Sequence, residues 1–231
     1  VGSEMCIRDS AHTESMMSDA RQKILARLRH APRPDISGMD PGAVESPVWD
    51  PEERIRRFTE RMTAVRAEII ETTEAGWIET LKSVCVQKQL GNLLYSPATE
   101  RGVRIRQQPP LEKLLTCEQE IEDWKSELFH TIDAAVTTTL GGIAETGTLI
   151  LWPDKNEPRM MSLVPPIHIA ILESGKLFNT FAEAVATMQW AGSMPTNALL
   201  ISGPSKSADI EQTLAYGVHG PKELVILLIR E

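Results

Sequence analysis

A polar loop at residues 202–211 has side chains that could bind an anion. Ser205, Lys206 and Ser207 follow an apolar run, and Asp209 comes directly after them. If a helix begins here, its free backbone N–H groups and these side chains would hold a phosphate or carboxylate. The same residues also fit plain helix capping, with Ser207 as the N-cap and Asp209 favoured by the helix dipole. Taken by themselves, the residues favour capping.

A histidine between two glycines follows in residues 217–221. Gly217 and Gly220 let the backbone take positive φ angles and approach a ligand closely. His219 could therefore act as a general acid or base near neutral pH. It could equally hydrogen-bond within its own turn, and the residues leave both interpretations open.

A third polar segment, residues 141–148, lies between two apolar runs. Glu145 could serve as a base or nucleophile, while Thr146, Thr148 and backbone N–H groups could hold an oxyanion. The alternative is a tight turn that needs glycine, flanked by threonines that favour strands. The segment is not a phosphate loop, because no Gly-Lys-Ser/Thr follows it.

Other residue types with chemical potential favour structural roles. His168 lies in an apolar strand, where a core histidine is the favoured interpretation. Cys6, Cys85 and Cys117 stand far apart and form no Cys-x-x-Cys pair, so we expect neither an iron–sulfur cluster nor a zinc site in this chain. No metal site is predicted.

The elements that position these loops indicate a mostly parallel α/β sheet with flanking helices, since strands and helices alternate from Thr131 onward. Loops at strand ends of such a sheet commonly carry ligands, and we expect all three polar loops to meet at one sheet. The predicted strands are 134–139, 148–152, 167–172, 198–201 and 224–229, with a turn at 140–142, a helix at 178–190 and a short helix between the last two strands.

The N-terminal part of the chain is predicted to be helical and divided into segments. Residues 1–15 are expected to be a non-native or disordered lead-in, and residues 16–51 a helix from about 19 to 30 followed by a Pro-rich arm. Residues 52–231 form the predicted α/β domain, which begins with helices at 52–73 and 78–89 and a strand at 93–95.

Composition excludes several classes of function. The chain has 231 residues, of which 42% are hydrophobic, enough for a sizeable core. Its formal net charge of −8 argues against nucleic acid or anionic lipid as the main partner. The apolar runs are too short to span a bilayer. The first 15 residues lack the apolar core of a secretory signal, so we expect a cytoplasmic protein.

Four blocks in one order carry a family resemblance: residues 143–149, 162–169, 202–211 and 217–221. Together they resemble the lactate-utilization protein C family, whose shared module is the LUD domain. The resemblance implies a fold similar to glucosamine-6-phosphate deaminase, ribose-5-phosphate isomerase and coenzyme A transferases. It also implies a cytosolic L-lactate utilization system, in which the chain and iron–sulfur partner proteins, with flavin-bearing or similar partners, oxidise L-lactate to pyruvate.

The resemblance also marks positions for testing. The candidate catalytic residues are Glu145, His219 and Asp209. The candidate ligand-binding residues are Thr146, Gly147, Thr148, Ser205, Lys206, Ser207 and Gly220. The chain departs from the family at Lys206 and Ser207, where arginine and threonine are frequent, and at residues 140–142, where an acidic residue is common.

We therefore expect a small anionic ligand, no cofactor bound by this chain, and iron–sulfur clusters in its partners. Two alternatives stay open. The chain could be a stand-alone isomerase or an acyl- or CoA-transferase-like enzyme, with Glu145 as base or nucleophile. It could also be a non-catalytic assembly module whose loops dock partner proteins.

Overall fold

The computed structural model describes residues 9–30, 47–116, 129, 131–192, 195–208, 214–217 and 220–230. The side chains of residues 9–18, 191, 207–208 and 214–216 lie outside this description. The chain forms two units, Val1–Glu45 and Ser46–Glu231. The first contains helix α1 (Asp9–His30), which includes the helix predicted from about residue 19 and whose described side chains are exposed.

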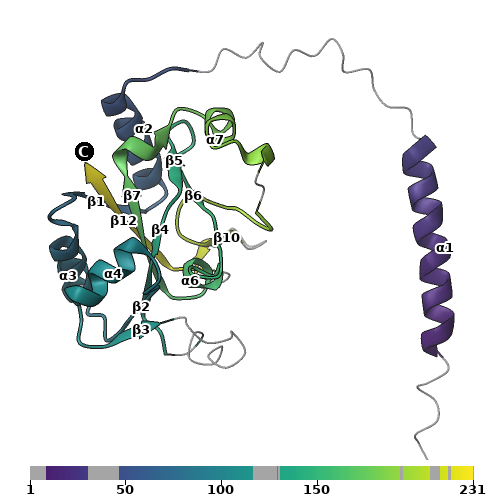
Figure 1. Cartoon of the computed structure of the whole chain (residues 1–231), viewed down its shortest axis with the longest axis horizontal. Coiled ribbons are helices and arrows are strands. Elements are labelled where there is room, and N and C mark those ends of the chain that lie inside the picture. Colours follow the sequence, from purple (N-terminus) through teal and green to yellow (C-terminus); the bar gives the residue numbers. More distant parts are fainter. Residues whose placement is uncertain are drawn as a thin grey trace, which may run out of the picture. The chain divides into compact units, whose positions relative to one another are not determined.

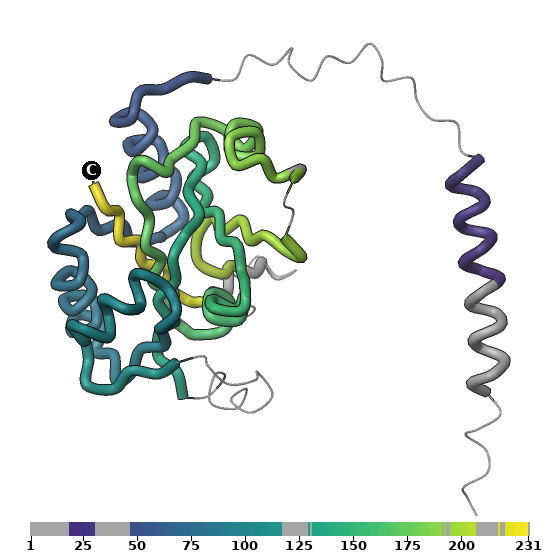
Figure 2. The backbone as a smooth tube through the Cα atoms, viewed as in Figure 1, coloured from purple at the N-terminus to yellow at the C-terminus, as the bar shows by residue number. Residues whose placement is uncertain are grey.

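The second unit is built on a parallel sheet, drawn in Figures 1 and 2. Its strand order is β1-β12-β7-β4-β2-β3, and each described neighbour pair runs in parallel. The strands are β1 (Glu68–Thr73), β2 (Leu93–Tyr95), β3 (Leu114–Thr116), β4 (Ala134–Thr138), β7 (Ile167–Glu173) and β12 (Glu223–Arg230). The predicted mostly parallel α/β fold is confirmed.

Both faces of this sheet are covered, which explains the continuous apolar run in β12. Val225, Leu227 and Ile229 pack beneath helices α3 (Trp77–Gln87) and α4 (Glu100–Gln107). The alternate β12 residues pack beneath helix α2 (Pro51–Ala64) and a second sheet. That second sheet has the strand order β8-β5-β6-β9, formed by β8 (Leu177–Phe178), β5 (Gly141–Ile143), β6 (Thr148–Leu151) and β9 (Leu199–Ile201).

The single helix predicted at 52–73 is wrong. Helix α2 ends at Ala64, where the N–H of Val65 caps it and Arg66 takes a φ of 70°. Residues 68–73 then form β1, which pairs with β12 at the sheet edge. Ile69 and Ile70 continue the helical spacing, but β-branched residues also suit a strand, and pairing with β12 decides between the two.

The predicted turn at 140–142 is also wrong in part. Residues 141–143 form β5, which pairs with β6 on one side and β8 on the other. A glycine pair favours a turn locally, yet it tolerates a strand when both edges are hydrogen-bonded. The pairing partners in β8 lie 35 positions further along the chain, so no local pattern shows them.

The predicted strand–helix–strand unit at the end of the chain is contradicted. Strand β9 pairs antiparallel with β6 in the second sheet, whereas β12 belongs to the first. Between them, β10 (Lys206–Ala208) pairs antiparallel with β11 (Leu214–Tyr216). The polar loops therefore do not share one sheet, because Glu145 belongs to the second sheet and Gly220 precedes β12 of the first.

The remaining elements are short: α6 (Met160–Leu163), α7 (Phe181–Thr187), and the 3₁₀ helices at Ser174–Lys176 and Trp190–Gly192. In the described part of the chain, no helix is both long and apolar enough to cross a membrane. The neighbouring strands β2 and β4 continue in opposite directions across the first sheet. The chain runs from β2 to β3 at one edge, whereas it runs from β4 to β7 and β12 toward the other edge. The carboxyl ends of β2 and β4 therefore flank a topological switch point, where open α/β sheets commonly bind ligands.

Candidate functional site

The Glu145 loop joins β5 to β6 in the second sheet. The Glu145 side chain is exposed, and its backbone N–H donates to the carbonyl of Asn179 at 3.0 Å. Gly147 takes a φ of 61°, and a β-carbon there would lie 2.5 Å from Cβ of Arg61. The predicted ligand-binding glycine thus has a packing role, since it lets α2 approach the loop closely.

A chain of hydroxyl groups connects this loop to the segment after β9. Thr148 Oγ1 lies 2.7 Å from Thr146 Oγ1 and 2.7 Å from Ser202 Oγ. Thr148 is buried, whereas Thr146 is exposed. The structure therefore brings the predicted residues Thr146 and Thr148 to the first residue of the predicted anion-binding loop.

We expect Thr148→Val to lower the free energy of unfolding by about 1–2 kcal/mol. Valine keeps the shape of threonine but breaks two hydrogen bonds, while the exposed residues Thr146 and Ser202 can bond to water instead. Urea denaturation checks this result, with Thr59→Val as the control. Thr59 Oγ1 is buried and has no hydrogen-bond partner among the described residues, so the same change there should be neutral or stabilising. Equal losses in both variants would contradict a role for the hydroxyl chain.

A cavity of about 250 Å³, here called the serine cavity, lies between the predicted polar loops. Its loops are held together by backbone bonds, because Ser205 N donates to the Pro221 carbonyl at 2.8 Å and Gly217 N donates to the Ser205 carbonyl at 3.0 Å. The cavity is lined by Ser162, Leu163, His168, Leu200, Ile201, Ser202, Gly203, Pro204, Ser205, Gly220, Pro221 and Leu224. Of the predicted ligand-binding residues, Ser205 and Gly220 meet here.

The predicted helix N-terminus at Ser207 is wrong. Ser207 pairs with Ala215 inside the β10–β11 hairpin, so no helix begins there and Ser207 is not an N-cap. The expected attraction of an anion to a helix dipole therefore has no basis at this loop. Lys206, in the same hairpin, is exposed. The two catalytic candidates Asp209 and His219 lie outside the described residues.

His168 lines the serine cavity, although the sequence favours a core role for it. Its side chain is 1% exposed, and its Nε2 lies 2.8 Å from Thr137 Oγ1. Its Nδ1 is buried and makes no hydrogen bond among the described residues. Burial lowers the pKa of His168 to about 4, so the imidazole is neutral at physiological pH. Nδ1 itself has almost no accessible surface, so the cavity presents the ring of His168 rather than this nitrogen.

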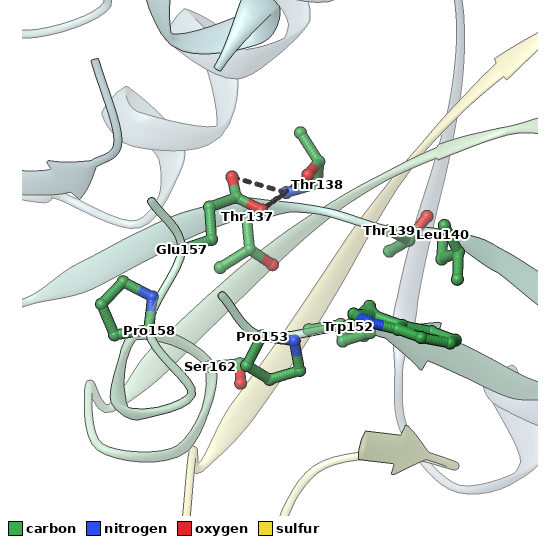
Figure 3. A pocket seen from close by; sticks show the side chains of 10 residues that line it. Thr137, Thr138, Thr139, Leu140, Trp152, Pro153, Glu157, Pro158 and Ser162 are labelled. Carbon is green, nitrogen blue, oxygen red and sulfur yellow. Dashed lines mark hydrogen bonds between the residues drawn. The ribbon is translucent and has the colours of Figure 1, made fainter. Parts of the chain in front are cut away.

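A second hollow, here called the threonine crevice, lies at the carboxyl end of β4 near the switch point. It measures about 110 Å³ and is lined by Thr137, Thr138, Thr139, Leu140, Leu151, Trp152, Pro153, Glu157, Pro158 and Ser162. Figure 3 shows the carboxylate of Glu157 bonded to Thr138. The bonds run from the Thr138 backbone N–H at 3.1 Å and from its hydroxyl at 2.6 Å.

The surroundings of Glu157 disfavour the ionised form of its carboxyl group. Burial raises the pKa of Glu157, the bonds from Thr138 oppose the rise, and the nearby Asp154 adds to it. No motif of the sequence marks Glu157, and its contact with Thr138 spans 19 positions, so the residue is not among the predicted site residues. Thr137, Thr138 and Thr139, at the end of β4 and just after it, are the local signal of this hollow in the sequence.

The described residues contain no cluster of potential metal ligands, and the cysteine among them is buried. Among the residues that the structure describes, no three His, Cys, Asp or Glu side chains cluster so that they could hold a metal ion. Cys85 is buried, and burial raises the pKa of its thiol to about 11. Such a thiol stays protonated and unreactive at neutral pH.

The family model of the LUD domain matches residues 55–229. The chain belongs to the LUD domain family. An uncharacterized protein of Neisseria meningitidis serogroup B is 42% identical over 220 residues, which cover 91% of this chain and 93% of that protein. Lactate utilization protein C of Geobacillus thermodenitrificans is 26% identical over 91% of this chain and 94% of its own length.

Lactate utilization protein C of Macrococcus caseolyticus is 40% identical, over 38% of this chain and 39% of its own length. The resemblance to the lactate-utilization protein C family is therefore confirmed. Among solved structures, a DUF162 family protein from Deinococcus radiodurans has a TM-score of 0.58 and 19% identity, over 79% of this chain and 99% of that one. At this identity, the likeness concerns the fold of the LUD domain.

Proposed function

We propose that this LUD-domain chain is a subunit of an L-lactate utilization system that oxidises L-lactate to pyruvate. The observation that carries the proposal is the match, along nearly the whole chain, to proteins named lactate utilization protein C. In this proposal, the electrons pass to iron–sulfur partner proteins, and the clusters and any flavin reside in those partners. This chain contributes a binding site for the small carboxylate.

The serine cavity is the site that we assign to this carboxylate. Ligand pockets combine a mostly apolar lining with a few convergent polar groups, and this cavity offers the hydroxyls of Ser202 and Ser205 beside the imidazole ring of His168. Each serine hydroxyl can both donate and accept a hydrogen bond. A hydroxyl-bearing carboxylate needs both kinds of partner.

The hydroxyl chain supports a route for protons in the proposed reaction. Oxidation of a 2-hydroxy acid to a 2-oxo acid releases two protons with two electrons. Ser202 lines the serine cavity and connects through Thr148 to the exposed Thr146, with 2.7 Å at each step. Hydroxyl groups at these distances can pass a proton along the chain, and the residues at both of its ends, Ser202 and Thr146, are exposed to solvent.

Add-back of the purified chain tests the proposal. Extract from cells lacking only this chain should lose lactate-dependent dye reduction, and the wild-type chain should restore it. Ser205→Val should restore at least about tenfold less activity, because it removes a polar contact and places a methyl group in the cavity. The matched control is Ser83→Val, which changes an exposed serine of α3 and should restore full activity.

Each rival function has a distinct outcome in this assay. Unchanged dye reduction without the chain would contradict a role in lactate oxidation. Turnover by the purified chain without partners would favour a stand-alone enzyme. Full recovery of dye reduction by Ser205→Val would show that the serine cavity has no part in the reaction, and it would favour an assembly module.

A further inference from the structure

The threonine crevice has an unusual hydrogen-bonding character, because three of its lining hydroxyl groups donate their protons to acceptors within the protein. The hydroxyl of Thr138 donates to Glu157, that of Thr139 donates to the Ile171 carbonyl at 2.8 Å, and that of Ser162 donates to the Arg159 carbonyl at 3.0 Å. A hydroxyl has one proton and two lone pairs. Each of these groups can therefore offer a ligand only acceptor lone pairs.

The backbone around the crevice is equally poor in donors. The N–H groups of Thr138, Thr139 and Leu140 bond to Glu157, Ile171 and Ile150 within the protein. The N–H of Glu157 donates to Asp154 Oδ1 at 2.8 Å, and Pro153 and Pro158 have no N–H at all. Trp152 adds one indole N–H donor. A single donor cannot offset the cost of burying a ligand carboxylate beside the carboxylate of Glu157.

The charges around Glu157 also favour a positive ligand. Asp154 lies nearby and raises the cost of ionising Glu157. Arg101 lines a small adjoining hollow together with Glu157, but it is already paired with Glu74 at 2.7 Å and Glu173 at 3.1 Å. The carboxylate of Glu157 therefore has hydrogen bonds from Thr138 but no cationic partner among the described residues.

We propose that the threonine crevice binds a small organic cation with a primary ammonium group. Glu157 accepts hydrogen bonds from the ammonium, and the hydroxyl lone pairs of the threonines accept the others. Trp152 lies across the crevice from Glu157 (Figure 3) and is held edge-to-face against Trp190 at 5.2 Å. An indole ring attracts cations through its quadrupole.

The size of the crevice limits this ligand. A protein cavity of about 150 Å³ holds benzene, which has six heavy atoms, so 110 Å³ has room for a group of about four heavy atoms at most. Ethylammonium and the end of a lysine side chain are within this limit. The proposal goes beyond lactate utilization, because the crevice would reject the carboxylate that we assign to the serine cavity.

Titration of the purified full chain with ethylammonium chloride tests the proposal, followed by ¹H–¹⁵N NMR. We expect saturable binding that shifts the Thr138 amide resonance, because this N–H donates to Glu157. Ethanol and acetate, which have similar size but lack the positive charge, should cause no saturable shift. The affinity should increase as the pH rises through the raised pKa of Glu157, since the ionised carboxylate is the binding form.

Glu157→Gln should weaken ethylammonium binding at least about tenfold. Glu112→Gln, a change at an exposed carboxylate between α4 and β3, should leave it unchanged. Trp152→Leu is a second variant with weaker binding expected, in case Glu157→Gln fails to fold. Stronger binding of Nα-acetyl-lysine amide than of ethylammonium would identify a protein side chain as the source of the ammonium.

Three outcomes would overturn the proposal: equal binding of ethanol, binding of acetate, or no shift with either ammonium compound. The assay uses this chain alone and involves no lactate. Its failure would therefore leave the proposed function standing, and a failure of lactate-dependent dye reduction would leave the ammonium site standing.

Discussion

Acidification from pH 6.5 to pH 4 will remove roughly 3 kcal/mol of stability through His168 alone. Burial lowers the pKa of His168 to about 4, against an ordinary value of 6.5 in the unfolded chain. Between these pH values the unfolded state binds a proton that the folded state does not. The stability that the neutral His168 contributes is therefore fully present above pH 6.5 and is lost as the pH falls toward 4.

Urea denaturation of the wild type and of His168→Gln, at several pH values from 7 to 4, measures this effect. Other titrating groups also change the free energy of unfolding over this pH range. Glu157, whose pKa is raised in the folded state, increases it as the pH falls, which is opposite to the effect of His168. These other contributions are the same in both proteins, so they cancel when the free energy of unfolding of His168→Gln is subtracted from that of the wild type. We expect this difference to shrink by roughly 3 kcal/mol as the pH falls. A difference that stays constant with pH would show that His168 reaches solvent.

Gly102→Ala will destabilise the protein by about 3 kcal/mol and lower its Tm by about 10 °C. Gly102 lies in the first turn of α4, where a β-carbon would stand 1.7 Å from the carbonyl oxygen of Ser96 and 2.8 Å from its carbonyl carbon. Neither partner is a flexible side-chain end, so the helix and the end of β2 must separate. The better helix propensity of alanine, about 1 kcal/mol, is too small to compensate.

Gly192→Ala is the matched control for this prediction. A β-carbon at Gly192 would meet no atom within 4 Å, and we expect a change within about 0.5 kcal/mol. Thermal unfolding by circular dichroism compares the two variants. Similar melting temperatures for both would show that α4 can move away from Ser96 at little cost. The switch point between β2 and β4 would then be a flexible part of the sheet.

The fold class and the family follow from local features of the sequence. The run Leu224–Ile229 predicts a strand covered on both faces, because parallel strands beneath two layers bury every side chain. Strand β2 and most of β4, β6 and β7 follow from similar apolar runs. The family resemblance depends on short blocks of residues, which are read directly from the chain whatever their positions in space.

The sheet partners and the candidate sites were decided by tertiary structure. Residues 68–73 continue a helical pattern, and residues 141–142 form a typical turn pair, yet each becomes a strand because another strand lies beside it. Local propensities differ by about 1 kcal/mol or less, and the hydrogen bonds of a paired strand outweigh them.

The same reason explains why the sites could not be foreseen in full. Thr148 meets Ser202 across 54 positions, and Thr137 meets His168 across 31. Each side chain by itself is an ordinary core or strand residue. Its chemistry depends on burial and on the one partner that the packing of two sheets places within hydrogen-bond distance, and neither is encoded in a local pattern of residues.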